Sequence, residues 1–344
     1  MSPKSFPLML LMTMLIIVFF LLNLLLGTVD IPMSSVLGSL FGHEENQIWR
    51  NIILKSRVPQ ALTALTAGAG LAISGLQMQT VFHNPLAGPS VLGISSGASL
   101  GVAFVVLATG SLLGTALSST GYVGEVVLTV AAIIGSIAVM ALIVYVSQKV
   151  RGNVTLLIIG VMTGYVANAI IGVLKYFSAE EDIRAYVIWG LGSFARVSGD
   201  QVWLFVTIMV ILIPLSMLLI KTLNLLLLGE QYARNLGLNI KSSRIWVIGC
   251  AGVIIAIVTA YCGPIMFLGL AVPHLCRAIW RTSDHRVLMP ATALTGAALA
   301  LVCNIIARMP GFEGALPINS VTALVGAPIV AMVLFRRRKR DATE

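Results

Sequence analysis

The sequence predicts an all-α integral membrane protein with about ten transmembrane helices. Three observations support this fold class: 58% of the 344 residues are hydrophobic, only 10% are charged, and the apolar residues lie in long blocks. A soluble domain would carry about 25% charged residues, and an apolar run of about 20 residues can span the hydrocarbon of a bilayer. The ten blocks are 8–27, 58–82, 92–107, 124–147, 155–176, 203–223, 243–262, 264–272, 288–307 and 319–335.

The lengths of the blocks and of their connections refine this expectation. The first block continues to Leu26 without the small-residue cleavage site of a signal peptide, so we expect it to remain as the first span. Blocks 92–107 and 264–272 are short, so each is expected to be a tilted, broken or re-entrant helix. The connections 28–57 and 177–202 are long enough for a short interfacial helix. We expect the whole chain, 1–344, to form a single transmembrane domain.

The basic residues lie almost entirely between the apolar blocks, where lysines and arginines in short loops decide orientation. If the N-terminus is inside, the inner segments hold fifteen of the 22 Lys and Arg residues, and the outer segments hold seven. The acidic residues run the other way, with nine of the 13 outside. The distribution predicts that both termini are cytoplasmic, and it accounts for the net charge of +9 without a nucleic-acid partner.

Motifs of the common nucleotide-binding and metalloprotease sites are missing. The chain contains no Gly-Lys pair, and therefore no GxxxxGK[ST] phosphate loop, and HExxH does not occur. The apolar blocks hold almost no ionisable residues, although proton- and sodium-coupled carriers usually need them. We therefore expect no enzyme activity, cofactor or metal site in this chain. The cysteines have no CxxC spacing and are interpreted as small buried hydrophobes: Cys250, Cys262, Cys276 and Cys303.

Four longer stretches have a specific pattern. They are RVPQ (57–60) with AGAGLAISGLQMQ (67–79), NPLAGPSVLGISSGA (84–98), LNLLLLGEQYARNLGL (223–238), and GLAVPHLCR (269–277) with SDHRVLMP (283–290). Together they resemble the permease subunits of bacterial iron-chelate, haem and cobalamin ABC importers, the FecCD type. The resemblance covers nearly the whole chain, with the motifs in the same order.

This resemblance implies a type II ABC importer permease fold in the inner membrane of a bacterium. It implies a second permease copy or homologue, two cytoplasmic ATPase subunits that bind ATP and Mg²⁺, and an extracytoplasmic substrate-binding protein. An iron chelate (siderophore) is the favoured cargo, with cobalamin or haem as the alternative. A secondary transporter is the alternative from another class. Whether the permease pair is a homodimer or a heterodimer stays open.

The polar segment 223–242 is expected to couple the permease to the ATPase, because it matches the family's coupling helices. Glu230 and Arg234 lie at i and i+4, so they could form an intrahelical ion pair worth about 0.3–0.5 kcal/mol. Alternatively, Glu230 faces a basic group on the ATPase. The residues assigned to this contact are Gly229, Glu230, Ala233, Arg234, Gly237 and Leu238.

Two proline-containing motifs are expected at helix ends on the cytoplasmic side. One should form a turn, and the other should form a surface that supports the coupling helices. Pro85 and Pro89 forbid helix continuation in NPLAGPS, which predicts a turn between two spans. Pro273 is expected to break the helix of GLAVPHLCR and to leave His274 and Arg277 at the cytoplasmic face. The second inner surface that these residues would form also includes Asp284, His285 and Arg286.

The resemblance also implies a docking site for the binding protein on the outer face. Arg57 begins the second block and Arg308 follows the ninth, where family members carry arginines that receive carboxylates. Family members often have another arginine three residues after the first, but this chain has Gln60 there. Docking would therefore be weaker or depend more on Arg308. The alternative for both arginines is that they extend from a helix end to the membrane surface.

Overall fold

The computed structural model describes residues 5–43, 46–108, 122–150, 152–197, 199–309 and 315–341. These residues form helices joined by turns, without a β-strand among them. Two compact units are distinguished. The first comprises Met1–Ile73, Ser193–Met217 and Phe267–Glu344, and the second comprises Ser74–Gly192 and Leu218–Met266. The helix α4, Val58–Val81, is continuous through the boundary between them.

The first unit contains most of the N-terminal and C-terminal helices. Its elements are α1 (Ser5–Leu25), α2 (Met33–Phe41), α3 (Gln47–Ile52), η1 (Ile53–Arg57), the first part of α4, η5 (Phe194–Arg196), α10 (Asp200–Met217), α14 (Phe267–Trp280), α15 (His285–Ala307) and α16 (Ile318–Asp341).

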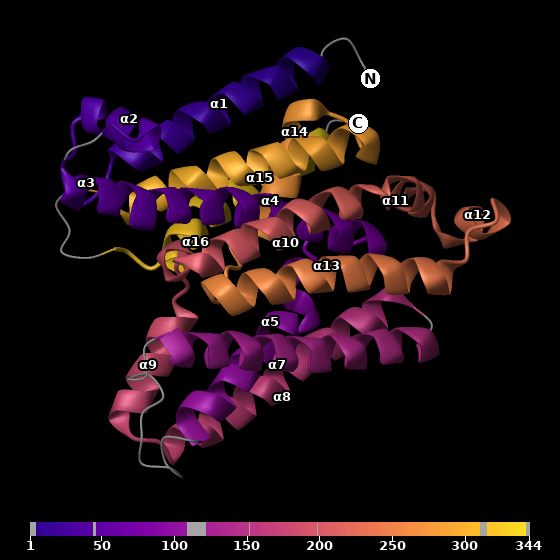
Figure 1. The fold of residues 1–344 in the computed structure, drawn as a ribbon. Helices are drawn as coiled ribbons and strands as arrows, with labels where there is room; N and C mark the ends of the chain where they lie inside the picture. The colour runs from indigo at the N-terminus through magenta and orange to yellow at the C-terminus, as the bar shows by residue number, and fades with distance from the viewer. Residues whose placement is uncertain are drawn as a thin grey trace. The chain divides into compact units, whose positions relative to one another are not determined.

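Two kinds of contact hold this unit together. Helix α1 runs beside α15 (Figure 1), and the amide of Asn304 donates to Oδ1 of Asn23 over 2.7 Å. A Cβ built on Gly68 of α4 would lie 2.4 Å from the carbonyl oxygen of Gly296. Small residues thus let α4 and α15 approach closely, as is typical where no hydrophobic effect drives helices together.

The second unit contains the middle of the chain. Its elements are the last part of α4, η2 (Pro89–Leu92), α5 (Ile94–Ala103), η3 (Phe104–Ala108), α7 (Tyr122–Lys149), α8 (Asn153–Tyr176), α9 (Glu180–Gly190), α11 (Ile220–Leu227), α12 (Glu230–Asn235) and α13 (Ile240–Cys262). Helix α7 packs against both α5 and α13. Glycines again permit a close approach between α5 and α7, because a Cβ on Gly135 would lie 2.1 Å from the carbonyl oxygen of Gly97.

Ten apolar helices correspond to the ten predicted blocks. Within the described ranges, seven are long and apolar enough to cross a membrane: Phe6–Leu25, Gln47–Val81, Val123–Lys149, Val154–Tyr176, Asp200–Met217, Ile240–Cys262 and His285–Ala307. Three apolar stretches are shorter: Ile94–Ala108, Phe267–Trp280 and Ile318–Met332, the last of which is part of α16. The shortness predicted for blocks 92–107 and 264–272 is confirmed. The predicted all-helical, multi-span membrane fold is therefore confirmed as well.

The two long connections between the blocks contain short helices, as their lengths allowed. Helices α2 and α3 lie in 28–57, and α9 lies in 177–202. The turn predicted at NPLAGPS is present, where the N–H of Leu86 donates to Oδ1 of Asn84 over 2.9 Å. The helical stretch of the second span begins at Gln47, well before the expected start at Arg57, because α3, η1 and α4 follow one another without a break.

The helix break predicted at Pro273 is wrong. Helix α14 begins at Phe267 and continues through Pro273 to Trp280. An interior proline costs a helix about 3 kcal/mol or more, but α14 packs along both α15 and α16. Packing in the membrane commonly compensates for the hydrogen bond that a proline removes.

Candidate functional site

Helix α12 is a short polar helix between α11 and α13, inside the predicted coupling segment. Glycines in the left-handed region of backbone conformation flank it, with φ of +94° at Gly229 and +87° at Gly237. At its C-terminal end, the N–H of Leu238 donates to the carbonyl of Ala233, and the N–H of Gly237 donates to that of Arg234, both over 3.0 Å. This pair of bonds is a Schellman motif, which requires the left-handed residue.

The reason for glycine at 237 is therefore backbone conformation. Among the described residues of this chain, other than the direct neighbours, nothing lies within 4 Å of a Cβ built on Gly237 or on Gly229. A side chain at Gly237 would meet open space within this chain, and its penalty would come from the positive φ.

Glu230 forms its ion pair with Arg244 of α13. The intrahelical pair with Arg234, one of the two interpretations of the sequence, is therefore not the ion pair that the structure contains. The Arg244 side chain is only 8% exposed and that of Glu230 is 34% exposed, so the pair is partly shielded from water. It attaches the first residue of α12 to the following long helix.

Large apolar side chains are exposed on α12 and next to its two ends. Leu228 is 57% exposed, Tyr232 70% and Leu236 61%. Arg234 lies on the same short helix and is exposed, whereas Ala233 is fully buried. Apolar side chains grouped on the exposed side of a polar segment are typical of a protein contact surface.

The predicted supporting residues of GLAVPHLCR do not lie on an exposed surface. Pro273 and His274 are buried inside α14, and Arg277 is half-buried. The reason is that α14 continues through the proline and packs on its neighbours. The carboxylate of Asp284 accepts the N–H of Arg286 over 2.9 Å and so caps α15, within which His285 is buried.

A string over 93–97, GISSG, has the GxSxG spacing of a hydrolase nucleophile elbow. Its context does not fit that role. It follows the 3₁₀ turn η2 and begins helix α5, whereas the elbow joins a strand to a helix. The hydroxyl of Ser95 lies 3.4 Å from that of Thr259, which is not a general base.

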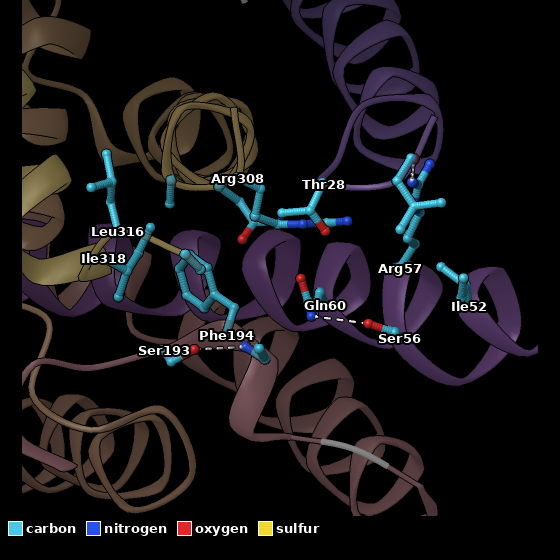
Figure 2. Close-up of a pocket in the computed structure, with 15 residues that line it drawn as sticks. Thr28, Ile52, Ser56, Arg57, Gln60, Ser193, Phe194, Arg308, Leu316 and Ile318 are labelled. Carbon is cyan, nitrogen blue, oxygen red and sulfur yellow. Dashed lines mark hydrogen bonds between the residues drawn. The ribbon is translucent and has the colours of Figure 1, made fainter. Parts of the chain in front are cut away.

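A second candidate site lies in the first unit, where a cavity of about 260 Å³ opens between helix ends (Figure 2). It is lined by the turn after α1, the start of α4, η5, the end of α15 and the start of α16. All three predicted docking residues line it: Arg57, Gln60 and Arg308. We call this cavity the arginine pocket.

Arg57 is fully enclosed at the edge of this pocket, with 1% of its surface exposed. Its Nη1 donates to the carbonyls of Leu24 and Leu25 over 2.7 Å each, and its Nη2 donates to that of Val29. These carbonyls belong to the last turn of α1 and the turn after it, where a cation is favoured. Arg57 thus caps α1, and it does not extend to the membrane surface as the alternative interpretation of the sequence held.

Arg308 follows the last residue of α15 and extends across the pocket toward Thr28 (Figure 2). Its Nη2 lies 2.8 Å, and that of Arg57 3.0 Å, from the point where a Cβ on Gly27 would sit. The two guanidinium groups therefore converge on one glycine. Burial, and then the charge of Arg57, lower the pKa of Arg308 to about 10.

Gln60 lies on α4 below Arg308. Its Nε2 donates to Oγ of Ser56 over 3.2 Å, and Figure 2 shows its oxygen on the side of Arg308. That Oε1 is buried without a hydrogen-bond partner.

Comparison with known proteins identifies the family. The model of the FecCD transport family matches residues 15–336. The chain belongs to the FecCD transport family. Among curated relatives, the vitamin B12 import system permease protein BtuC of Klebsiella pneumoniae is 36% identical over 333 residues, which cover 96% of this chain and 93% of that protein. BtuC of Salmonella typhimurium is 36% identical over 281 residues, which cover 81% and 82% of the two chains.

Solved structures agree with the assignment. An inward-facing conformation of a putative metal-chelate type ABC transporter has a TM-score of 0.82 and 28% identity, and the match covers 96% of this chain and 99% of that one. PsaBC from Streptococcus pneumoniae, in complex with Fab, has a TM-score of 0.53 at 14% identity and covers 87% and 95%, which supports the fold alone. This FecCD-family chain is the membrane-spanning permease of an ABC importer.

The two predicted sets of site residues in this FecCD-family permease thus lie in different kinds of place. The docking set comes together in one pocket, and the coupling set lies on and around α12. Sequence reasoning missed Gly27, which the two arginines flank, and Asn304, which lines the same pocket and binds Asn23. An asparagine inside an apolar block such as 288–307 is a signal that could have identified Asn304.

Proposed function

We propose that this permease imports a bulky metal chelate in an ATP-driven complex, and that vitamin B12 is the first cargo to test. The curated relatives named above are vitamin B12 permeases, which supports the cobalamin alternative over the iron chelate favoured at first. An iron chelate (siderophore) is the second candidate, supported by the metal-chelate type transporter that shares the fold.

The observation that carries the proposal is the exposed face of α12. In an ATP-driven importer, energy must enter from another chain, because this one has no phosphate loop. Tyr232 and Leu236 offer apolar contact area to a cytoplasmic ATPase subunit, and the Glu230–Arg244 pair holds the helix in place. Two such subunits, each with ATP and Mg²⁺, would act on a permease pair.

The arginine pocket is the proposed docking site for an extracytoplasmic binding protein. Arg308 would receive a carboxylate of that partner, while Arg57 holds the pocket wall by capping α1. In this proposal the permease lies in the inner membrane of a bacterium, the arginine pocket faces the extracytoplasmic side and α12 faces the cytoplasm. Both termini would then be cytoplasmic, in accord with the distribution of basic residues.

The deciding experiment is transport in proteoliposomes that contain the permease, its ATPase and an excess of binding protein. We expect uptake of labelled cyanocobalamin that requires hydrolysable ATP and is insensitive to ionophores. If only a ferric siderophore is taken up, the cargo is the second candidate, and the assignment as an importer permease is unchanged. Uptake that follows an ion gradient and ignores ATP would refute the proposal in favour of a secondary transporter.

Docking has its own test. Binding-protein association measured over a range of salt concentrations should slow for Arg308→Gln, because a rim charge mainly changes the association rate. The matched control is Lys55→Gln, which removes an exposed cation from η1 outside the pocket. Equal association rates for the two variants would show that the arginine pocket is not the docking site.

A further inference from the structure

The arginine pocket holds two cations and no acid among the described residues that line it. The Nη2 atoms of Arg57 and Arg308 flank Gly27, at 3.0 and 2.8 Å from the point that a Cβ on this glycine would occupy. Asp30 lies near enough to attract Arg57 but does not line the cavity. Two like charges enclosed together are unfavourable unless an anion lies between or beside them.

Unused hydrogen-bonding atoms point to what this anion is. Nε of Arg57 and Nη1 of Arg308 are buried donors without a partner, and Oε1 of Gln60 is a buried acceptor without one. Buried polar atoms of native proteins nearly always have a partner, so such a cluster indicates a missing ligand. The ligand must accept from guanidinium groups and also donate to an amide oxygen.

We propose that the arginine pocket binds a phosphate-class oxyanion between the guanidinium groups of Arg57 and Arg308. Guanidinium donors match the spacing of phosphate oxygens and form charge-assisted bonds with them. A monoprotonated phosphate also has an O–H that can donate to Gln60, which chloride and sulfate lack. The cavity of about 260 Å³ leaves room for the anion and several waters.

The phosphate oxygens that accept from the arginines could come from free inorganic phosphate or from the phosphodiester of a phosphatidylglycerol headgroup, in which a glycerol hydroxyl would replace the P–O–H as the donor to Gln60. Neither source depends on the proposed cargo or on the binding protein, so the inference can stand if the proposed function fails. If the proposed docking function and the anion site are both correct, the anion occupies the pocket while no carboxylate of the binding protein is docked. The anion and that carboxylate then compete for the pocket.

The test is thermal unfolding of the full-length chain, purified in a maltoside detergent with HEPES as the only anion. We expect added sodium phosphate to raise the Tm by about 2 °C or more. Sodium chloride and sodium sulfate at the same ionic strength should raise it less. Arg308→Gln should lose the response to phosphate, and Lys55→Gln should keep it.

A second variant protects the test against a folding defect in Arg308→Gln. Gln60→Glu places a carboxylate in the pocket, so it should raise the basal Tm and remove the phosphate response. Phosphatidylglycerol added in detergent separates the sources, because a headgroup site would respond to the lipid and not to free phosphate. Equal responses of wild type and Arg308→Gln to every anion and to the lipid would overturn the proposal.

Discussion

The amide nitrogen of Asn304 donates to the side-chain oxygen of Asn23 over 2.7 Å, and this bond joins α15 to α1. The amide of Asn23 in turn donates to the carbonyl of Leu301 over 3.1 Å and to that of Phe19 over 2.8 Å. Both asparagines are buried. They form a polar connection between two otherwise apolar helices, and Asn304 also lines the arginine pocket.

We expect Asn304→Leu to destabilise the protein modestly. Interhelical hydrogen bonds inside membranes are worth about 0.6 kcal/mol on average and about 1.7 at most. The measurement is a double-mutant cycle with Asn23→Leu, followed by thermal unfolding. The coupling between the two positions should fall within that range, and strictly additive effects would mean that the bond contributes nothing.

Arg57→Glu should disrupt the end of α1. The change leaves the carbonyls of Leu24, Leu25 and Val29 without their donor and puts an acid beside them. Hydrogen bonds to charged groups contribute about 1.5–3 kcal/mol each, so a loss of about 3 kcal/mol or more is expected. Yield of monodisperse protein and Tm are the readouts. Lys55→Glu is the control, and equal behaviour of the two variants would show that the cap is unimportant.

Arg308→Met should raise the Tm in buffer free of phosphate. The pKa of Arg308 is lowered from its ordinary value to about 10 in the folded protein, by burial first and by Arg57 second. Between about pH 10 and the ordinary value, only the unfolded chain keeps the proton, so stability rises with pH there. At neutral pH the charged side chain therefore destabilises this helix end. A lower Tm for Arg308→Met at pH 7.5 would contradict this sign.

Gly237→Leu should abolish uptake and leave membrane insertion intact. The position has φ of +87°, where a residue with a Cβ is strained, and the Schellman motif depends on it. Gly237→Asn is the matched control, because asparagine tolerates the left-handed region better than other side chains. We expect uptake in proteoliposomes to survive in the asparagine variant. Equal loss in both variants would point to the size of the residue at the ATPase contact.

Glu230→Arg should uncouple ATP hydrolysis from uptake, and the swap Glu230→Arg with Arg244→Glu should restore coupling. The swap keeps an ion pair between α12 and α13, which positions the helix. ATPase activity with and without the binding protein is the readout. A swap that stays inactive would mean that Glu230 faces a basic group of the ATPase, as the other interpretation of the sequence holds.

The sequence predicted the spans well because hydrophobic length is a local property. All ten apolar blocks correspond to helices, and the two blocks expected to be short are short. The turn at Asn84 was predictable for the same reason, since two prolines within a few residues exclude a helix whatever surrounds them. A single proline did not have this effect at Pro273, where packing against α15 and α16 decided the outcome.

The chemistry of the sites depended on contacts that no local pattern contains. Arg57 takes its partners from the end of α1, more than 30 residues earlier in the chain. Glu230 had a suitable partner four residues away, but it pairs with Arg244 at a separation of 14. Gly27 stands in no motif, and its role is visible only when two distant arginines converge on it.

The cap that Arg57 places on α1 also sets an order of events during synthesis. The donor to the carbonyl of Leu24 is Arg57, which lies 33 residues later in the chain. A ribosome synthesises these residues in about two to seven seconds. The bond from Asn304 to Asn23 closes over 281 residues, and it must wait about 14 to 56 seconds. During that interval the end of α1 is capped, but Oδ1 of Asn23 lacks the donor that Asn304 later supplies, while the amide nitrogen of Asn23 can bond the carbonyl of Phe19 within α1. A nascent chain arrested after α4 should therefore protect the end of α1 from amide exchange while leaving Asn23 open to crosslinking.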